Sequence, residues 1–381
     1  MGDMKRTRTT AVTIGDAARA LDHIAPPALA QSWDNVGLLA GDRTARCRRV
    51  LLCIDLAPAV LEEAVRLRCE LVMAYHPPLF QPIRRILADS HGTDSILHRA
   101  IAAGIAIYSP HTALDAAPGG TNDVLAGLCE LTDLGPFEYV TTPSDHSKVV
   151  TFVPPAQLEA VAQAMFQAGA GRIGDYEQCS FRLNGTGTFF GTESTNPRVG
   201  RKGRLEEVEE IRLEMVAPNS LLPEVVAALR RSHPYEEPAF DIYPLTSEPV
   251  QGIGRVGQLP AGCTLGSLAR RLRKATGSKV VTLVGDAGTV IKRAAVCVGA
   301  AGRLPLERPR SADCDVIVTG EIRHHDALTL LRRGVCAIAL GHWESERPAL
   351  EPLGRRIREM LPGIETILSQ ADVPPFRPAP A

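Results

Sequence analysis

Three short segments of the chain carry histidine and carboxylate side chains at spacings that suit a metal centre. One histidine follows a short apolar run, and in two other segments a histidine precedes a carboxylate by four residues. If a helix begins there, that spacing places both side chains on one side of its first turn. Imidazole and carboxylate groups suit zinc, manganese or iron, and a carboxylate can bridge two ions. The candidate ligands are His76, His111, Asp115, His342 and Glu346.

Each of these residues also has a structural interpretation. A single histidine is more often a surface or capping residue than a ligand, so none of them identifies a site alone. His76 could cap a strand, and Glu346 could pair with the adjacent Arg347. The metal interpretation is favoured because three such segments follow strands and would meet at the same end of a sheet.

The elements around the first two segments alternate between strand and helix. Val50–Ile54, Leu71–Ala74 and Ile105–Tyr108 are continuous apolar runs, typical of strands buried on both faces. A helix beginning at Pro58 and a second over Thr93–Ala103 separate them. This order predicts a parallel or mixed sheet with helices between the strands.

The last third of the chain repeats the pattern. Ala294–Val298, Val316–Val318 and Val335–Leu340 are expected strands, and His325–Arg333 is an expected helix that ends at Gly334. A further helix is expected over Glu344–Met360, so His342 would lie just before its start and Glu346 in its first turn.

The middle of the chain has a β-α-β then β-α-β order, which is typical of a ferredoxin-like domain. We therefore expect an α/β main domain with a mixed sheet, built from residues 1–145 and 247–381, and an inserted α+β domain over residues 146–246. The expected elements of the insert are Lys148–Val153, Ala156–Gln167, Ser180–Phe190, Glu209–Val216, Leu221–Arg231 and Ala239–Leu245.

Composition limits the classes of function. The 381 residues are 45% hydrophobic and carry a formal net charge of −1, so no global charge directs the protein to nucleic acid or to an anionic membrane. No apolar run reaches the length of a membrane span, and no secretory signal is recognised. The nine cysteines form no C-x-x-C pair. These features predict a cytoplasmic protein.

Several other motifs have competing interpretations. Gly252–Gly257 fits G-x-G-x-x-G, but no helix is expected to follow, so the glycines are expected to let strands approach closely.

His324 and His325 would point about 100° apart on a helix, and Glu321 could orient a ligand or act as a base. The segment from His233 to Glu237 could be a ligand site or a solvated turn, while residues 33–35 are expected to form a turn that lines the cavity.

Five motifs resemble, in order, those of the dinuclear-metal-centre hexameric family, also called GTP cyclohydrolase type 2 homologs. They are SWDNVGLLAGD, AYHPPLF, YSPHTALDAAPGGTNDVLA, VIVTGEIRHHDAL and GHWESER, and the match runs from about Trp33 to Arg347. The insert resembles the PII-like or CutA-like domain of the longer members through AGAGRIGDYEQCSF, GTGTFF and HPYEEPAFDIY.

The resemblance implies a toroidal homohexamer with one or two divalent metal ions (Zn, Mn or Fe) per subunit. Carried over by motif, the ligands are His76, Asp115, His342 and Glu346, with Asp115 or Glu346 as a bridging carboxylate. His111 is a ligand or a partner of one. Many members have two adjacent histidines where this chain has Tyr75 and His76, which puts full occupancy by two metals in question.

Two classes of function follow from these expectations. The first is a metal-dependent hydrolase acting on a phosphoester, a nucleotide or a cyclohydrolase-type substrate, with no catalytic residue assigned. The second is a non-catalytic metal-binding regulatory or scaffold hexamer whose insert binds a small molecule or a partner. Turnover by the metal-loaded protein distinguishes them.

Overall fold

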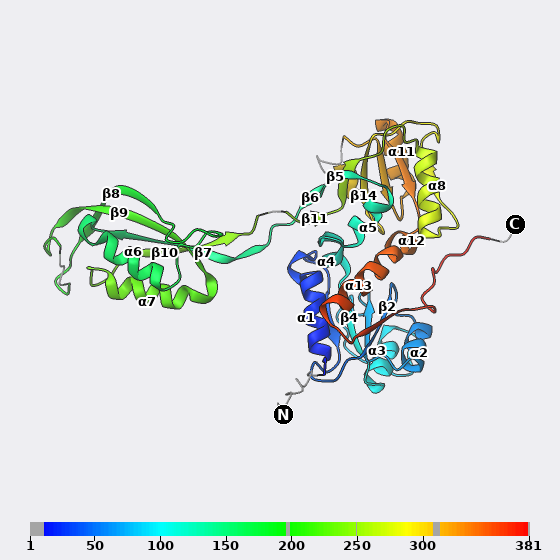
Figure 1. The fold of residues 1–381 in the computed structure, drawn as a ribbon, viewed down its shortest axis with the longest axis horizontal. Coiled ribbons are helices and arrows are strands. Elements are labelled where there is room, and N and C mark those ends of the chain that lie inside the picture. The colour runs from blue at the N-terminus through cyan, green and yellow to red at the C-terminus, as the bar shows by residue number, and fades with distance from the viewer. Residues whose placement is uncertain (1–10, 196–198, 249, 308–312, 380–381) are drawn as a thin grey trace, which may run out of the picture. The chain divides into compact units, whose positions relative to one another are not determined.

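The computed structural model describes residues 11–195, 199–248, 250–307 and 313–379. The chain divides into two compact units, here called the main unit (Met1–Val140 with Pro249–Ala381) and the inserted unit (Thr141–Glu248). The division lies within a few residues of the expected insert over 146–246. Figure 1 shows both units, and each is described by itself below.

The first sheet of the main unit has five strands in the order β1-β4-β3-β2-β17, of which only β1 is antiparallel to its neighbour. Helices α1 and α13 pack on one face, and α2 and α3 pack on the other. The bounds are α1 Ile14–Ile24, β1 Gly37–Ala40, β2 Arg49–Cys53, α2 Pro58–Arg66, β3 Leu71–Ala74, α3 Thr93–Ala102, β4 Ala106–Ser109, α13 Leu350–Met360 and β17 Glu365–Leu368.

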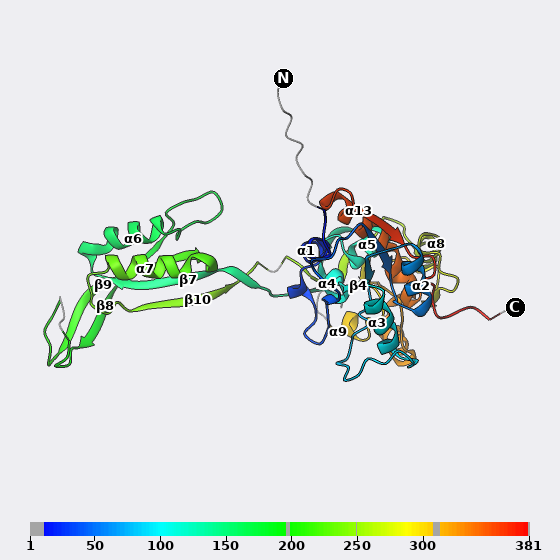
Figure 2. The same ribbon diagram turned by 90° about the horizontal axis from the view of Figure 1, so that it is seen from below.

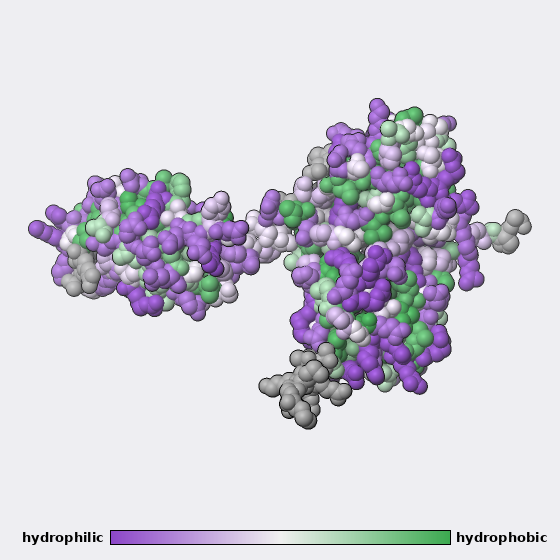
Figure 3. All heavy atoms as spheres, viewed as in Figure 1, coloured by the Kyte–Doolittle hydropathy of each residue, from purple (hydrophilic) through white to green (hydrophobic). Residues whose placement is uncertain are grey.

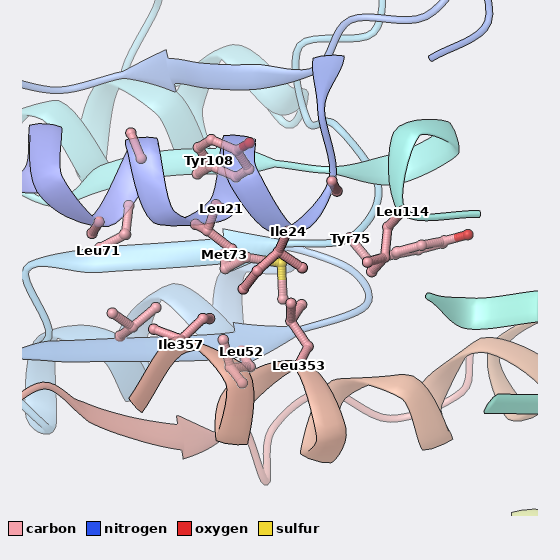
Figure 4. Packing of buried hydrophobic residues seen from close by; sticks show 14 of the residues in the cluster. Leu21, Ile24, Leu52, Leu71, Met73, Tyr75, Tyr108, Leu114, Leu353 and Ile357 are labelled. Carbon is pink, nitrogen blue, oxygen red and sulfur yellow. The ribbon is translucent and has the colours of Figure 1, made fainter. Parts of the chain in front are cut away.

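Alternate side chains of these strands enter opposite hydrophobic clusters. Leu52 and Met73 face α1 and α13, whereas Leu51 and Val72 face α2 and α3. Figure 4 shows the first cluster, with Tyr75 at the end of β3 and its hydroxyl pointing away from the packed side chains. The continuous apolar runs in the sequence follow from this burial on both faces.

The second sheet of the main unit has six strands in the order β13-β16-β15-β14-β12-β5, and its central three are parallel. Helices α5 and α8 cover one face, and α9 and α11 cover the other. The bounds are α5 Thr121–Leu128, β5 Thr132–Gly135, β12 Arg255–Gln258, α8 Leu265–Thr276, β13 Thr282–Val284, β14 Arg293–Cys297, α9 Leu304–Glu307, β15 Val316–Thr319, α11 His324–Arg333 and β16 Cys336–Ala339.

The single helix expected over Glu344–Met360 is wrong, because two helices occupy that region. Helix α12 covers His342–Glu346, a 3₁₀ turn covers Arg347–Ala349, and α13 begins at Leu350. Pro348 explains the break, since it has no backbone N–H and its ring clashes with the carbonyl four residues earlier. The ligand-bearing turn is therefore a separate short helix, which lies between the two sheets of the main unit (Figure 1).

The inserted unit has the expected β-α-β-β-α-β order and a fully antiparallel sheet, β10-β7-β9-β8. Helices α6 and α7 pack on one face of this sheet in both ribbon views (Figures 1 and 2). The bounds are β7 Pro143–Val153, α6 Leu158–Gln167, β8 Phe181–Phe190, β9 Leu205–Pro218, α7 Leu222–Ser232 and β10 Phe240–Thr246. On the face seen in Figure 3, hydrophilic and hydrophobic side chains are interspersed.

A short ladder joins the chain on either side of the insert. Strands β6 (Glu138–Tyr139) and β11 (Gly252–Ile253) are antiparallel, and a Cβ at Gly252 would lie 1.9 Å from the carbonyl oxygen of Glu138. Strand β12 follows Gly254, so among the described residues the glycine motif serves close strand approach and opens no helix.

None of the helices in the described part of the chain is both long enough and apolar enough to cross a bilayer.

Candidate metal centre

The candidate ligands lie where parallel strands of both sheets end. His76 follows β3, and helix α4 (His111–Ala116) follows β4, both in the five-stranded sheet. His342 and Glu346 lie on α12, which follows β16 of the six-stranded sheet. The carboxyl ends of parallel strands are the usual place for sites in α/β proteins. Here two such edges of one unit contribute to the same site.

Three of the five candidates converge tightly. The Nε2 atom of His342 lies 3.2 Å from Oε1 of Glu346, and Nε2 of His76 lies 3.4 Å from Oε2 of the same carboxylate. One donor atom of each residue lies within 4.8 Å of the others, and within the described residues this is the only such group of three or more. Two imidazoles and one carboxylate are a ligand set that suits zinc, manganese or iron.

The buried carboxylate shows that a cation fits this group. Glu346 is 3% exposed, and its Oε2 atom has no hydrogen-bond partner among the described residues although His76 is near it. A buried acceptor without a partner is costly, and a cation between the three side chains would satisfy it. Gly299, with a φ of +62°, leaves the space open, since a Cβ there would lie 2.4 Å from Oε1 of Glu346.

Carboxylates hold the other nitrogen of each histidine. The Nδ1 atom of His76 lies 2.9 Å from Asp55, and that of His342 lies 3.1 Å from Glu321. His111 makes the same contact with Asp34, also at 2.9 Å. A carboxylate on Nδ1 fixes the ring orientation and leaves Nε2 as the donor, as is usual for histidines that bind metals.

The sequence indicates only some of these orienting carboxylates. It suggests such a role for Glu321 and places Asp34 in a turn that lines the cavity. Asp55 was missed, although it follows β2, the strand beside β3 in the parallel sheet. That position was the available signal, because neighbouring parallel strands end at the same edge.

The charges of the three converging side chains depend on one another. Burial lowers the pKa of His76, but its contacts with Asp55 and Glu346 outweigh burial and raise it to about 10. The contact with Glu346 also raises the pKa of His342. Burial acts to raise the pKa of Glu346, yet the two histidines hold it below its ordinary value. A cation would replace the protons on the two imidazoles, so its binding should release protons.

Asp115 and His111 lie beside the converging group and are not part of it. Asp115 Oδ1 accepts a hydrogen bond of 2.5 Å from the Tyr75 hydroxyl and another from Thr121. Burial raises the pKa of Asp115. The His111 ring is 5.3 Å from that of His76 and 5.5 Å from that of Tyr75. These two candidates therefore lie adjacent to the converging group, where they could hold a second ion.

Two other histidine motifs lie apart from the centre. His324 and His325 are exposed at the start of α11, with ring centroids 5.4 Å apart. His233 belongs to the inserted unit, where it is buried and both ring nitrogens are hydrogen bonded to the backbone, at Phe152 and Tyr235. Neither motif belongs to a metal-type group among the described residues.

A cavity of about 750 Å³ opens onto the centre. His76, His342, Asp55 and Glu321 form one side of it. The other lining residues include Lys279, Trp343 and Arg377. All of these lining residues belong to the main unit. The cavity has the volume of a typical ligand pocket and gives a small molecule access to the centre.

This chain is similar in sequence to proteins of a known family. The profile of Duf34/NIF3 (NGG1p interacting factor 3) matches residues 12–375. A Mycobacterium tuberculosis protein named GTP cyclohydrolase 1 type 2 homolog is 39% identical over 341 residues, covering 88% of this chain and 89% of its own. A Halalkalibacterium halodurans protein of the same name is 36% identical, with 92% and 95% covered.

Solved structures agree with the sequence comparison. A Bacillus cereus protein related to NIF3 is 31% identical with a TM-score of 0.73, covering 96% of this chain and 99% of its own. Protein SA1388 of Staphylococcus aureus is 26% identical with a TM-score of 0.78, covering 97% and 99%. The likeness to both extends over main and inserted units alike, because nearly all of each chain is covered.

Proposed function

Because this chain belongs to the Duf34/NIF3 family, we propose that it is a metal-dependent hydrolase with its centre at His76, His342 and Glu346. The observation that carries the proposal is the buried Glu346 carboxylate, which has one oxygen without a hydrogen bond and an imidazole Nε2 near each oxygen. The ligand types favour zinc, manganese or iron.

A bound divalent ion would supply Lewis acidity, polarising a carbonyl or phosphoryl oxygen and lowering the pKa of water towards neutrality. The protein's own residues orient the ligand atoms and form the cavity beside them. Asp55 and Glu321 keep the two Nε2 atoms directed at Glu346, and the adjoining cavity admits the substrate. Asp115 and His111 are the residues available for a second ion. Phosphoesters, nucleotides and cyclohydrolase-type substrates suit such a centre.

Elemental analysis followed by a turnover screen tests this proposal. The purified protein should contain zinc, manganese or iron and should hydrolyse at least one phosphoester or nucleotide. Glu346→Gln keeps the size of the side chain but removes its charge, so metal content and turnover should fall together. A metal-loaded protein that turns over nothing in the screen, or a Glu346→Gln variant with full metal content, would count against it.

The second candidate is a non-catalytic metal-binding protein whose insert binds a small molecule or a partner. The observation that favours it is the inserted unit, which is compact and has its own hydrophobic cluster. None of the candidate metal ligands belongs to this unit. Its β-α-β-β-α-β order and antiparallel sheet support a PII-like or CutA-like assignment for this unit. Full metal content without turnover would be the expected result for this candidate.

We also propose that the protein assembles as a homohexamer. The exposed segment beside the centre supports self-association, because Phe80, Ile83, Ile86 and Leu87 are 40–48% exposed within eight residues. Light scattering should give a mass near six times the 40.9 kDa chain. A stable monomer at micromolar concentration would rule the ring out.

A further inference from the structure

The segment after α7 of the inserted unit is a turn in which Glu236 and Glu237 are exposed, whereas its first residue, His233, is buried. His233 is 7% exposed, its Nε2 lies 3.0 Å from the carbonyl oxygen of Phe152, and its Nδ1 accepts the backbone N–H of Tyr235. Burial lowers the pKa of His233, so the ring is neutral near pH 7. The histidine therefore anchors the segment, and the residues that follow it are held in place.

The anchored segment forms one wall of a cavity of about 340 Å³ that lies wholly within the inserted unit. The other walls come from β8, from Glu210 of β9, and from Gly191, Thr195 and Val199 between these strands. The volume suits a metabolite-sized molecule at the lower end of the usual range for ligand pockets. Its aromatic lining residues are Phe189, Phe190 and Tyr235, and its carboxylates are Glu210, Glu236 and Glu237.

Glu210 is the half-buried carboxylate of the cavity. It extends from β9 across Gly187 of β8, where a Cβ would lie 2.2 Å from its Oε2 atom. Glycine at this position therefore leaves room for the carboxylate against the strand. Two other carboxylates on β9, Glu206 and Glu214, pair with arginine or lysine. No such ion pair is made by Glu210 with any residue that the structure describes.

The hydroxyl of Tyr235 is the second polar group. Its oxygen is buried, and no group within the described part of the chain donates a hydrogen bond to it. Burial, together with the nearby Glu210 carboxylate, raises the pKa of Tyr235, so the phenol stays protonated. The phenol can donate its proton to Glu210, which leaves the remaining lone pairs of that carboxylate and the phenol oxygen as acceptors. A ligand that carries N–H donors would satisfy these acceptors.

The residues that line the cavity favour some classes of ligand over others. An anion is disfavoured by three carboxylates. A metal ion is disfavoured because the described residues form no group of three metal-type ligands here. A purely apolar guest would leave the carboxylate and hydroxyl unsatisfied. Aromatic faces beside a carboxylate instead suit organic cations, through cation–π attraction and a charged hydrogen bond.

We propose that this cavity binds a small organic cation, an alkyl ammonium or guanidinium compound, with Glu210 as its counter-ion and Phe189 and Tyr235 as its aromatic walls. The ammonium or guanidinium N–H groups donate to the Glu210 carboxylate, and the alkyl part lies against the rings. The proposal is independent of the metal chemistry described above, because no residue of the main unit takes part in it.

Calorimetric titration of the full-length protein with putrescine and agmatine tests the proposal, with 1,4-butanediol as the uncharged analogue of the same chain length. Both amines should bind at one site per chain and the diol should not bind. Glu210→Gln should weaken amine binding roughly ten- to a hundredfold, as expected for a lost charged hydrogen bond. Glu209→Gln makes the same charge change at the exposed neighbouring position and should bind like the unmodified protein.

Gly187→Ala provides a second variant that keeps every charge and displaces the Glu210 carboxylate by the added methyl group. It should also weaken binding, and circular dichroism should show a native fold for all three variants. Equal affinities of Glu210→Gln and Glu209→Gln would overturn the proposal, as would diol binding as tight as that of the amines. Absence of amine binding up to millimolar concentration would overturn it as well.

Discussion

At the scale of single residues, the centre consists of donors and of the groups that aim them. His76 and His342 each use one ring nitrogen towards Glu346 and give the other to a carboxylate. Because an imidazole ring can rotate about its side-chain bonds, a donor without such a partner would sample several directions. The orienting carboxylates therefore belong to the function of the centre as much as the ligands do.

His342→Ala should lose most of the bound metal while the protein stays folded. The variant removes one of three donors and leaves His76 and Glu346 with too few bonds to hold the ion. Elemental analysis after matched metal loading measures the effect. His324→Ala is the control, since this exposed histidine lies outside the converging group. Equal metal contents in the two variants would show that His342 is not a ligand.

Asp55→Asn should weaken metal binding roughly ten- to a hundredfold, the usual effect of removing an orienting partner. The amide keeps the shape of the side chain but cannot act as a charged acceptor for Nδ1 of His76. Metal competition with a chelator gives the affinities. Asp89→Asn changes an exposed carboxylate in the same unit and should leave affinity unaltered. A normal affinity for Asp55→Asn would mean that His76 is oriented by packing alone.

Tyr75→His should raise the number of ions bound per chain. Tyr75 now donates to Asp115, which occupies an oxygen that a second ion would need, and the phenol supplies no imidazole nitrogen. The substitution releases Asp115 and adds a donor beside His111. Elemental analysis under saturating metal measures stoichiometry. An unchanged stoichiometry would indicate that Tyr75 does not limit occupancy and that other residues complete the site.

At the scale of elements, the short helix α12 and the C-terminal segment support one another. Asp372 accepts hydrogen bonds from Trp343 and Arg347 at the two ends of α12 and from the backbone N–H of Ile54, the residue before Asp55. One buried carboxylate therefore ties the helix that carries two ligands to the strand end that carries an orienting group. The Pro-rich end of the chain begins only after this attachment.

A second buried carboxylate, Glu63 on α2, holds the same segment and gives it a pH dependence. It accepts hydrogen bonds from the Ser369 hydroxyl and from the backbone N–H groups of Gln370 and Ala371. Burial acts to raise its pKa, but these bonds hold the pKa below the ordinary 4.5. A depressed carboxyl pKa stabilises the fold above the unfolded-state pKa, and this stabilisation is lost as pH falls through the folded-state pKa.

Glu63→Gln should therefore accelerate amide hydrogen exchange over residues 369–371 at pH 6. The difference from the unmodified protein should shrink below about pH 4.5, because protonation of Glu63 then has the same effect as the substitution. Hydrogen exchange read by mass spectrometry at matched pH measures both. Glu359→Gln, an exposed carboxylate on α13, should exchange normally. A constant difference at every pH would contradict a role for the Glu63 charge.

At the scale of the whole molecule, the chain leaves and re-enters the main unit at one place. Strands β6 and β11 pair there, and Val140 donates its N–H to the carbonyl of Gln251 at 2.9 Å. All five candidate ligands lie in the main unit, which keeps its own clusters of buried side chains. The insert is thus an addition to a sheet framework that is complete without it.

Replacing residues 141–248 by a short linker should leave a folded, metal-binding main unit. The two ends to be joined are already hydrogen bonded, so closing them requires little loop entropy. Circular dichroism should keep an α/β signal, and metal content per chain should match that of the full protein. An insoluble or metal-free product would show that the insert is needed for the main unit to form.

Local sequence determined much of the fold and the types of the metal-binding residues. Apolar runs such as Leu71–Ala74 matched their strands because a strand buried on both faces must be apolar throughout. The β-α-β-β-α-β order of the insert was also readable, since each element has its own periodicity. His76, His342 and Glu346 could be singled out because histidine and carboxylate after strands mark the edge where sites form.

Only the tertiary structure decided which of these groups meet and how each is held. His76 and Glu346 are 270 positions apart and follow strands of different sheets. Nothing in the spacing of the sequence therefore predicts that the two side chains approach to 3.4 Å. The same holds for Asp55 behind His76, for Tyr75 bound to Asp115, and for the anchoring of His233 against Phe152. Periodicity is a local property of the backbone, whereas these contacts depend on how separate elements pack, and packing is decided by the whole chain at once.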